Sequence, residues 1–327
     1  MKNQLNFLVI LFFSLFPNYV FAKTEPVKRP RLIVVLVIDQ FRADFLTRFE
    51  NDFLPAKSAD GRLGGFRYLM ANGAYYPYGE YEILQPMTGP GHASILTGSY
   101  PYQSGIALND WYDVKSGQTV YCTEDQSVSL VGAKTSDPHS GTSPRNLIGT
   151  TAGDEIKSAD PRALVVSIAL KDRSAILLGG HLADLALWFE TSSFQWISGQ
   201  FYLPAGKLPE WVDKLNHEIT ARKGKPLKWD ALTKFDEEAS EHTFVNESKL
   251  AKSIGPSFPH TFEAGSMAEL STPYGVELTM AAASRAVEFY NLGQDEHTDI
   301  LTVSVSSHDY VGHSFGPHTR EMKEMTL

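Results

Sequence analysis

The stretch LIVVLVID, residues 32–39, decides the fold of this chain. It begins with an unbroken run of apolar, mostly β-branched residues, which is the pattern of a parallel strand buried on both faces of a sheet. The run stops at Asp39. Because ligands of open α/β sheets bind beyond the carboxyl ends of the strands, an acid at this point is well placed for chemistry. The alternative role for Asp39 is to cap a helix over the following segment, FRADFLTRF.

Two further apolar runs have the same character: ALVVSIAL, residues 163–170, and DILTVSVSS, residues 299–307. Apolar residues that recur at steps of three and four predict a helix before the second run. The predicted buried face of this helix consists of Val276, Met280, Ala283, Val287 and Tyr290. Strands that alternate with helices predict an α/β fold with a central, mostly parallel sheet flanked by helices.

Two other segments have weaker patterns. Residues 64–82 predict a helix closed by Gly73 and then a strand. Residues from about 190 to 260 are less regular and rich in aromatic and charged side chains. We expect them to form an irregular insertion or cap beside the sheet.

The stretch QPMTGPGHASILTG, residues 85–98, places one hydroxyl, that of Thr88, just where a helical pattern begins. Glycines allow a sharp turn and a close approach of a ligand, and the start of a helix directs unpaired N–H groups at that ligand. This combination predicts an anion site. The alternative is an ordinary turn with Thr88 as the helix N-cap.

Composition narrows the classes of function. The chain has 327 residues, of which 43% are hydrophobic and 12% aromatic, enough for one large α/β domain or two modest ones. Its formal charge of −9 argues against nucleic acid or an anionic membrane as the main partner. Since Cys122 is the only cysteine, any metal must be held by Asp, Glu, His or hydroxyl ligands.

Residues 1–22 have the form of a secretory signal peptide, with Lys2 near the start and a short apolar run behind it. That run is too short for a stop-transfer helix, and no later segment of the sequence is apolar enough over a sufficient length to span a bilayer. We therefore expect an exported protein without a stable membrane anchor, periplasmic if the cell is Gram-negative.

The residues beyond the strands suit metal-assisted catalysis. Asp309 and His313 are four positions apart and can reach one cation if the chain turns helically after the strand. A threonine hydroxyl is a poor nucleophile at neutral pH, but a bound dication activates it, and a second ion can stabilise the leaving oxygen. This chemistry accounts for Asp39, Thr88, Asp309 and His313 together.

Three further side chains suit a phosphate group. The amide of Asn109 could donate to a phosphoryl oxygen; a turn residue is its alternative role. Lys171 and Arg173, which follow the strand at 163–170, would ordinarily be solvated surface charges. Beside a metal pair they would meet the extra negative charge of a phosphate monoester, Arg173 through its planar fork and Lys171 as a point charge.

The motifs VIDQFRADFL, PMTGPGHASILTG, ALNDWYD, SIALKDRSAILLGG and SSHDYVGHSFGP together resemble those of the bacterial alkaline phosphatases that carry a threonine nucleophile and two zinc ions. The same superfamily includes the nucleotide pyrophosphatases/phosphodiesterases. The resemblance runs from about residue 30 to the end. It implies zinc-dependent hydrolysis of small phosphate monoesters through a phosphothreonine at Thr88, with phosphodiester or nucleotide pyrophosphate hydrolysis as the alternative.

The resemblance also implies the ligands of both zinc ions. Thr88 and Asp39 would bind one ion, and Asp309 and His313 the other. Asn109, Lys171 and Arg173 would form the phosphate-binding trio of the monoesterases. The diesterase relatives lack the Lys/Arg pair, so ALKDRSA favours monoesters.

The sequence departs from the family pattern at its C-terminal end. The family completes its zinc sites with an Asp-His pair and a further histidine downstream, which this sequence lacks, and His318 matches neither. Each zinc would have two protein ligands where three or four are needed. We therefore expect residues 23–327 to be the N-terminal part of an alkaline phosphatase-like domain, incomplete at the C-terminus and with little or no turnover alone. A non-catalytic binding module is the alternative.

Overall fold

The protein is described from a computed structural model that covers residues 29–133, 141–233, 253–255 and 257–327. Residues 31–327 form one structural unit, to which all the elements below belong. The predicted signal peptide, residues 1–22, lies outside the described residues.

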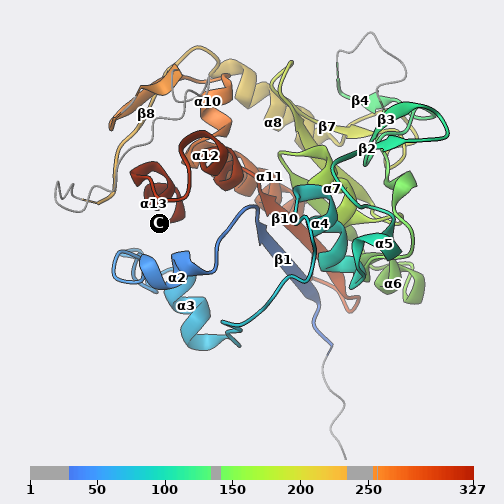
Figure 1. Cartoon of the computed structure of the whole chain (residues 1–327), viewed down its shortest axis with the longest axis horizontal. Helices are drawn as coiled ribbons and strands as arrows, with labels where there is room; N and C mark the ends of the chain where they lie inside the picture. The colour runs from blue at the N-terminus through green and yellow to red at the C-terminus, as the bar shows by residue number, and fades with distance from the viewer. Residues whose placement is uncertain (1–28, 134–140, 234–252, 256) are drawn as a thin grey trace, which may run out of the picture. The chain divides into compact units, whose positions relative to one another are not determined.

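A six-stranded sheet with the order β1-β10-β5-β6-β7-β4 forms the centre of the fold (Figure 1). The strands in that order are Leu32–Ile38, Asp299–Val305, Val165–Ala169, Leu185–Glu190, Gln195–Gly199 and Leu130–Val131. The first four are parallel, whereas β7 pairs antiparallel with both β6 and β4. The predicted α/β fold with a mostly parallel sheet is confirmed.

The three strands predicted to carry chemistry are neighbours. In the register of the sheet, Ile38 of β1 pairs with Val305 of β10, and Ser304 of β10 pairs with Ala169 of β5. The carboxyl ends of β1, β10 and β5 are therefore level. Every residue of β5 and β10 is buried, so their polar side chains find partners inside the protein: Thr302 of β10, for example, donates to Ser167 of β5.

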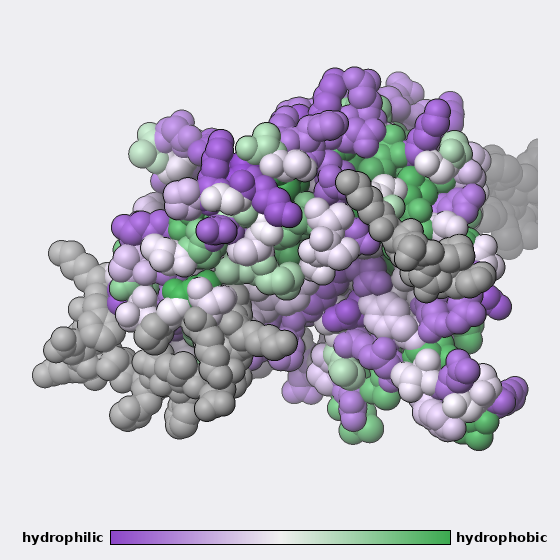
Figure 2. Space-filling model, turned by 90° about the horizontal axis from the view of Figure 1, so that it is seen from above, coloured by the Kyte–Doolittle hydropathy of each residue, from purple (hydrophilic) through white to green (hydrophobic). Residues whose placement is uncertain are grey.

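Strand β1 is less buried than its sequence predicts. It forms an edge of the sheet within the described residues, and Val34 and Leu36 are 57% and 48% exposed. The prediction that β1 is buried on both faces is wrong for this structure, because Val34 and Leu36 share one face of the strand and the described residues leave that face largely uncovered. Exposed hydrophobic residues also gather in patches among hydrophilic ones on the face shown in Figure 2.

Helices cover both faces of the sheet. On one face α8 (Glu210–Ala221) and α11 (Pro273–Tyr290) pack against strand residues such as Ile168 and Val303. On the other face α7 (Asp172–Gly179) and α6 (Ala152–Ala159) pack against the opposite side chains of the same strands. Helix α4 (Thr88–Thr97) lies against α7, and this contact brings the glycine turn to the sheet.

The remaining elements are shorter. They are α2 (Asp44–Arg48), α3 (Gly65–Asn72), α5 (Pro101–Ser104), β2 (Asp110–Asp113), β3 (Gln118–Tyr121), the 3-10 turn Pro144–Asn146, β8 (Pro226–Trp229), β9 (His260–Glu263), α10 (Met267–Leu270), α12 (Ser307–Phe315) and α13 (Arg320–Thr326). A second apolar core, rich in aromatic rings, joins α2, the antiparallel pair β8-β9, α12 and α13. It fixes α12 against the end of the sheet.

Two local predictions are corrected. Gly73 does follow helix α3, but no strand comes after it among residues 74–87, where aromatic side chains stay exposed instead of alternating in and out. Asp39 is not a helix cap, since α2 begins five residues later, after Ala43.

The region expected to be an insertion at about 190–260 has two parts. Its first half continues the α/β body, because β7 joins the central sheet and α8 packs on it. Its second half contains β8, and residues 234–252 lie outside the described part of the chain. No helix within the described residues is long and apolar enough to cross a membrane.

The buried face of α11 agrees only in part with the predicted one. Ala283 is buried and Val287 and Tyr290 are partly buried against the core, whereas Met280 is exposed. The helix instead buries Gly275, Ala282 and Ala286, together with Leu278 and Thr279. Small side chains allow a close approach of the helix to the sheet, and a pattern of large apolar residues does not reveal them.

This correction can be tested by urea unfolding. Ala286 is fully buried, so Ala286→Leu should overpack the contact with the sheet and reduce the free energy of unfolding by about 1–3 kcal/mol. Met280→Ala, on the exposed side of the same helix, should change it by about 0.5 kcal/mol or less. If Met280→Ala were the more damaging change, the face predicted from the sequence would be the right one.

Candidate active site

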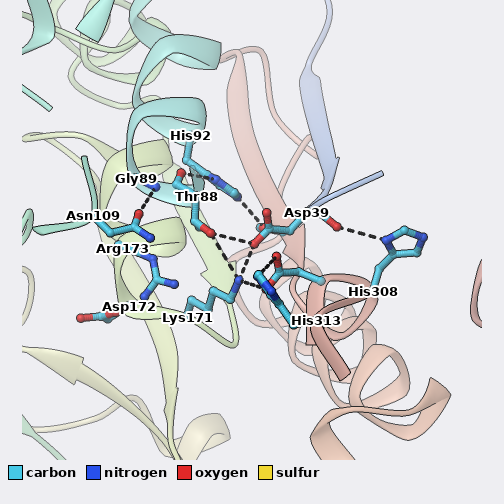
Figure 3. A network of polar contacts seen from close by, with 12 residues as sticks. Asp39, Thr88, Gly89, His92, Asn109, Lys171, Asp172, Arg173, His308 and His313 are labelled. Carbon is cyan, nitrogen blue, oxygen red and sulfur yellow. Dashed lines mark hydrogen bonds and ion pairs between the residues drawn. The ribbon is translucent and has the colours of Figure 1, made fainter. Parts of the chain in front are cut away.

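Asp39, Lys171 and Asp309 meet where β1, β5 and β10 end. Asp39 directly follows β1, Lys171 is the N-cap residue of α7 just after β5, and Asp309 lies in the first turn of α12, which follows β10. The Nζ atom of Lys171 lies 2.7 Å from Oδ2 of Asp39 and 2.5 Å from Oδ2 of Asp309 (Figure 3). One ammonium thus joins two carboxylates from separate parts of the chain.

This charge cluster is buried. The side chains of Lys171, Asp39 and Asp309 are only 5%, 9% and 8% exposed. Burial by itself raises the pKa of Asp39, but the charge of Lys171 and its hydrogen bond outweigh this and hold the pKa below its ordinary value. Asp39 is therefore ionised at neutral pH.

The hydroxyl of Thr88 belongs to the same cluster. Thr88 is the first residue of α4 and is buried. Its Oγ1 donates to Oδ2 of Asp39 over 3.3 Å and accepts from Nζ of Lys171 over 3.3 Å. It is not the helix N-cap, a position taken by Met87, so its side chain faces the charged residues instead of the helix end.

The backbone N–H groups of the glycine turn are not free to bind an anion in the way that the sequence predicted. Gly89 donates its N–H to Oδ1 of Asn109 over 2.7 Å, Pro90 has no N–H, and the N–H of Gly91 donates to the Met87 carbonyl. The expected row of free N–H groups at the start of α4 is therefore largely used within the protein. An anion here must be held mainly by side chains.

Asn109 is placed by this contact with the turn. A Cβ atom at Gly89 would lie 3.0 Å from Oδ1 of Asn109 and 3.3 Å from Sγ of Cys122, so a larger residue at position 89 would push Asn109 away. The side-chain oxygen of Asn109 accepts the hydrogen bond from Gly89. The NH₂ group of the same side chain is therefore the part that can donate a hydrogen bond to a ligand.

Arg173 lies beside the cluster on α7. Its NH1 donates to the hydroxyl of Tyr121 over 3.1 Å, and that hydroxyl donates to Oδ1 of Asp172 over 2.6 Å. Burial opposes the charge of Arg173, but Tyr121 and Asp172 raise its pKa above the ordinary value, so it stays protonated. Its buried Nε has no hydrogen-bond partner among the described residues.

His313 extends the cluster toward solvent. The segment after β10 does turn helically, and in α12 the Nε2 atom of His313 lies 3.2 Å from Oδ1 of Asp309. The imidazole is 70% exposed while the carboxylate is buried. The pair therefore offers a cation one buried carboxylate oxygen and one accessible imidazole nitrogen as ligand atoms.

The structure links the sequence-predicted residues. Asp39, Thr88, Lys171, Asp309 and His313 form one connected network of contacts. The other two predicted residues border it: Asn109 touches the residue after Thr88, and Arg173 lies two positions beyond Lys171 (Figure 3).

His92 is a site residue that sequence reasoning missed. Its Nδ1 lies 2.7 Å from the carbonyl oxygen of Thr88 and its Nε2 lies 2.8 Å from Oγ of Ser304 on β10. Burial lowers the pKa of His92, so the ring is neutral. A carbonyl only accepts, so Nδ1 carries the proton and Nε2 accepts from Ser304. The spacing of four from Thr88 on one helix was the signal for this contact.

His308 was missed as well. It is buried beside the rings of Phe41 and Phe45, and its Nδ1 lies 3.2 Å from the carbonyl oxygen of Asp39. Its Nε2 lies 3.3 Å from Oγ1 of Thr326 on α13. His308 thus holds the backbone of Asp39 from the side of the second core. Its position next to Asp309 was the only signal in the sequence.

The donor atoms of the network fit a metal site in kind. Carboxylates of Asp39 and Asp309, the hydroxyl of Thr88 and the imidazole of His313 are oxygen and nitrogen ligands suited to zinc and to other dications. The ammonium of Lys171 already takes the place of a cation between the carboxylates. Within the part of the chain that the structure describes, however, no three His, Cys, Asp or Glu side chains form a ready group of ligands.

Comparison with known proteins shows which family the chain belongs to. The family model for type I phosphodiesterase / nucleotide pyrophosphatase matches residues 33–326. The alkaline phosphatase PafA of Elizabethkingia meningoseptica is 37% identical over 313 residues, which cover 93% of this chain and 55% of that enzyme. The chain thus spans little more than half the length of this relative.

Solved structures agree with the sequence match. The crystal structure of wild-type PafA superposes with a TM-score of 0.80 at 34% identity, over 93% of this chain and 58% of that one. A PafA variant with substitutions at a threonine, an asparagine, a lysine and an arginine superposes with a TM-score of 0.77 at 32% identity and the same coverage. The resemblance found in the sequence is confirmed, and the chain belongs to the type I phosphodiesterase/nucleotide pyrophosphatase family of phosphoester hydrolases.

Proposed function

We propose that this chain carries the nucleophile and the phosphate-binding residues for hydrolysis of small phosphate monoesters through a phosphothreonine at Thr88, with turnover dependent on further metal ligands. The observation that carries the proposal is the position of the Thr88 hydroxyl, which lies 3.3 Å from the carboxylate of Asp39 and 3.3 Å from the ammonium of Lys171. The names of the relatives, which are alkaline phosphatases, support the same reaction class. We further propose export to the periplasm, on the signal-like pattern of residues 1–22.

The reaction has two steps. The oxygen of Thr88 attacks phosphorus, a bond forms between them, and the bond from phosphorus to the ester oxygen breaks to release the alcohol. Water then attacks the phosphothreonine and releases inorganic phosphate with Thr88 restored. Asp39 accepts the hydrogen bond of the Thr88 hydroxyl, and the nearby charge of Lys171 favours loss of the hydroxyl proton.

Two cationic side chains set the preference for monoesters. A monoester dianion carries one more negative charge than a diester, and Lys171 and Arg173 bring two positive charges to the site. Support also comes from the PafA variant: its substituted asparagine, lysine and arginine follow its threonine by 21, 83 and 85 positions. Asn109, Lys171 and Arg173 follow Thr88 by the same 21, 83 and 85 positions.

Zinc is the proposed metal. Asp39 and Thr88 would hold one ion and Asp309 and His313 the other, with further donors needed to complete each site, since a catalytic zinc ordinarily has three protein ligands. Bound zinc would supply Lewis acidity, which lowers the pKa of a coordinated hydroxyl and stabilises negative charge on a phosphoryl oxygen. The charge and hydrogen bond of Lys171 hold the pKa of Asp39 below its ordinary value despite burial, so this carboxylate stays available as an anionic ligand at neutral pH.

The role of Thr88 can be tested in the full native protein. Thr88→Ala should lower kcat for a monoester by roughly a thousandfold or more, because the attacking atom is lost. Thr88→Ser keeps a hydroxyl and should retain measurable turnover. Thr97→Ala, at the other end of the same helix, is the matched control and should retain most of the activity. Wild-type turnover in Thr88→Ala would exclude Thr88 as the nucleophile.

The monoester preference depends on Arg173. Arg173→Ala should reduce kcat/KM for a monoester roughly tenfold more than for a diester with the same leaving group, because one charge-assisted contact with the extra oxyanion is lost. Arg162→Ala, which removes a surface guanidinium that is 75% exposed, should affect neither substrate. An equal loss of kcat/KM for the monoester and the diester would contradict the role assigned to Arg173.

Metal content gives a readout that does not depend on turnover. Elemental analysis of the purified protein should find zinc, and Asp309→Asn should lose most of it, since a neutral amide is a weaker ligand than a carboxylate. Asp230→Asn, a change at a surface carboxylate that pairs with Lys228, is the control and should keep the wild-type content. Unchanged zinc in Asp309→Asn would contradict its role as a ligand.

A further inference from the structure

A cavity opens beside the Thr88 turn and has no place in the mechanism above. It is a cleft open to solvent with a volume of about 670 Å³, and it is lined mostly by apolar and aromatic side chains. These include Ile83, Leu84, Tyr100, Pro101, Tyr102 and Leu108. Mostly apolar clefts of this size are typical of small-molecule sites.

The cavity borders the phosphate-binding residues. Gln85, in its wall, precedes Thr88 by three residues, a stretch of chain that spans at most about 10 Å. Leu108, also in the wall, directly precedes Asn109. The hydroxyl of Tyr81 donates to the carbonyl oxygen of Gly91, and this bond fixes the segment before the turn to helix α4. The wall of the cavity thus includes residues that lie next to Asn109 and close to Thr88 along the chain.

The aromatic side chains of the cavity offer a flat surface. The rings of Tyr100 and Tyr102 are stacked, with centroids 6.0 Å apart and an angle of 11° between their planes. Tyr102 is 79% exposed and Leu84 is 98% exposed, so both are accessible to a ligand. Stacked rings with an accessible face favour a planar aromatic group as the occupant.

The negative charge in the wall of the cavity disfavours a substrate that carries a second anionic group there. Glu82 is the charged residue of the wall, and the hydroxyl of Tyr100 donates to its carboxylate over 2.8 Å. Of the described residues that line the cavity, none is Lys or Arg. A second phosphate or a carboxylate on the substrate would be repelled here, whereas an uncharged ring would not.

We propose that this cavity is a subsite for the leaving alcohol of the substrate and that it selects alcohols with a flat, uncharged aromatic group. The inference rests on the proposed phosphomonoesterase function, because the cavity borders Thr88 and Asn109. It names a class of substrate, the monophosphate esters of alcohols that carry an aromatic ring, which the charged residues of the site do not specify.

The test compares two substrates whose leaving groups have similar chemistry: 2-phenylethyl phosphate and ethyl phosphate. In the wild-type protein kcat/KM should favour the phenylethyl ester by roughly two- to tenfold, the factor expected for one aromatic contact. The double variant Tyr100→Ala/Tyr102→Ala should bring this ratio close to one. The ratio is taken on one preparation, so partial loss of folded protein cancels.

Tyr112→Ala is the matched control, since Tyr112 lies on β2 outside the cavity and is 65% exposed. It should leave the ratio unchanged. A wild-type ratio of one, or a ratio that survives the double variant, would overturn the subsite.

A binding experiment separates this inference from the proposed function. Saturation-transfer NMR with 2-phenylethylphosphonate, which cannot be hydrolysed at its P–C bond, should show transfer to the phenyl protons in wild type and in Thr88→Ala. This signal should vanish in the double tyrosine variant, and inorganic phosphate should compete with it. Signal without hydrolysis of any ester would refute the proposed function and keep the subsite. An equal signal in the double variant, or no competition by phosphate, would refute the subsite.

Discussion

The rest of the site depends on one buried contact, in which the ammonium of Lys171 lies between the carboxylates of Asp39 and Asp309. Two carboxylates held together away from water repel each other, and removing one partner of such a buried group ordinarily costs about 3–5 kcal/mol. The contact joins the ends of β1 and β5 to α12. A cation at this position is therefore needed whether it is supplied by the protein or by a bound metal ion.

Two neutral histidine side chains position the site residues through hydrogen bonds to backbone carbonyl groups. His92 connects the carbonyl of Thr88 to Ser304 on β10, and His308 connects the carbonyl of Asp39 to α13. Burial lowers the pKa of both rings, so they hold the backbone without adding charge to the cluster. The nucleophile and the first carboxylate are thus positioned from opposite sides, one by the sheet and the other by the second core.

Much of this arrangement could be predicted from the sequence, because long apolar runs mark buried parallel strands and the residues after them must meet at one end of the sheet. The rest depends on contacts that no local pattern records. The small residues on α11, such as Ala286, are invisible to a search for large apolar side chains. The N–H groups at the start of α4 were expected to face a ligand, but that of Gly89 donates to Asn109, and His92 reaches β10 through Ser304, a partner 212 residues away.

The central claim is that phosphoryl transfer passes through Thr88. The most direct measurement is to mix the native protein with a monoester, quench the reaction in acid within its first turnovers, and locate the phosphoryl group by peptide mass spectrometry. The account predicts one phosphoryl group on the peptide that contains Thr88, which disappears as substrate is exhausted. Steady hydrolysis with no phosphorylated Thr88 at any time, or with the phosphoryl group on another residue, would contradict it.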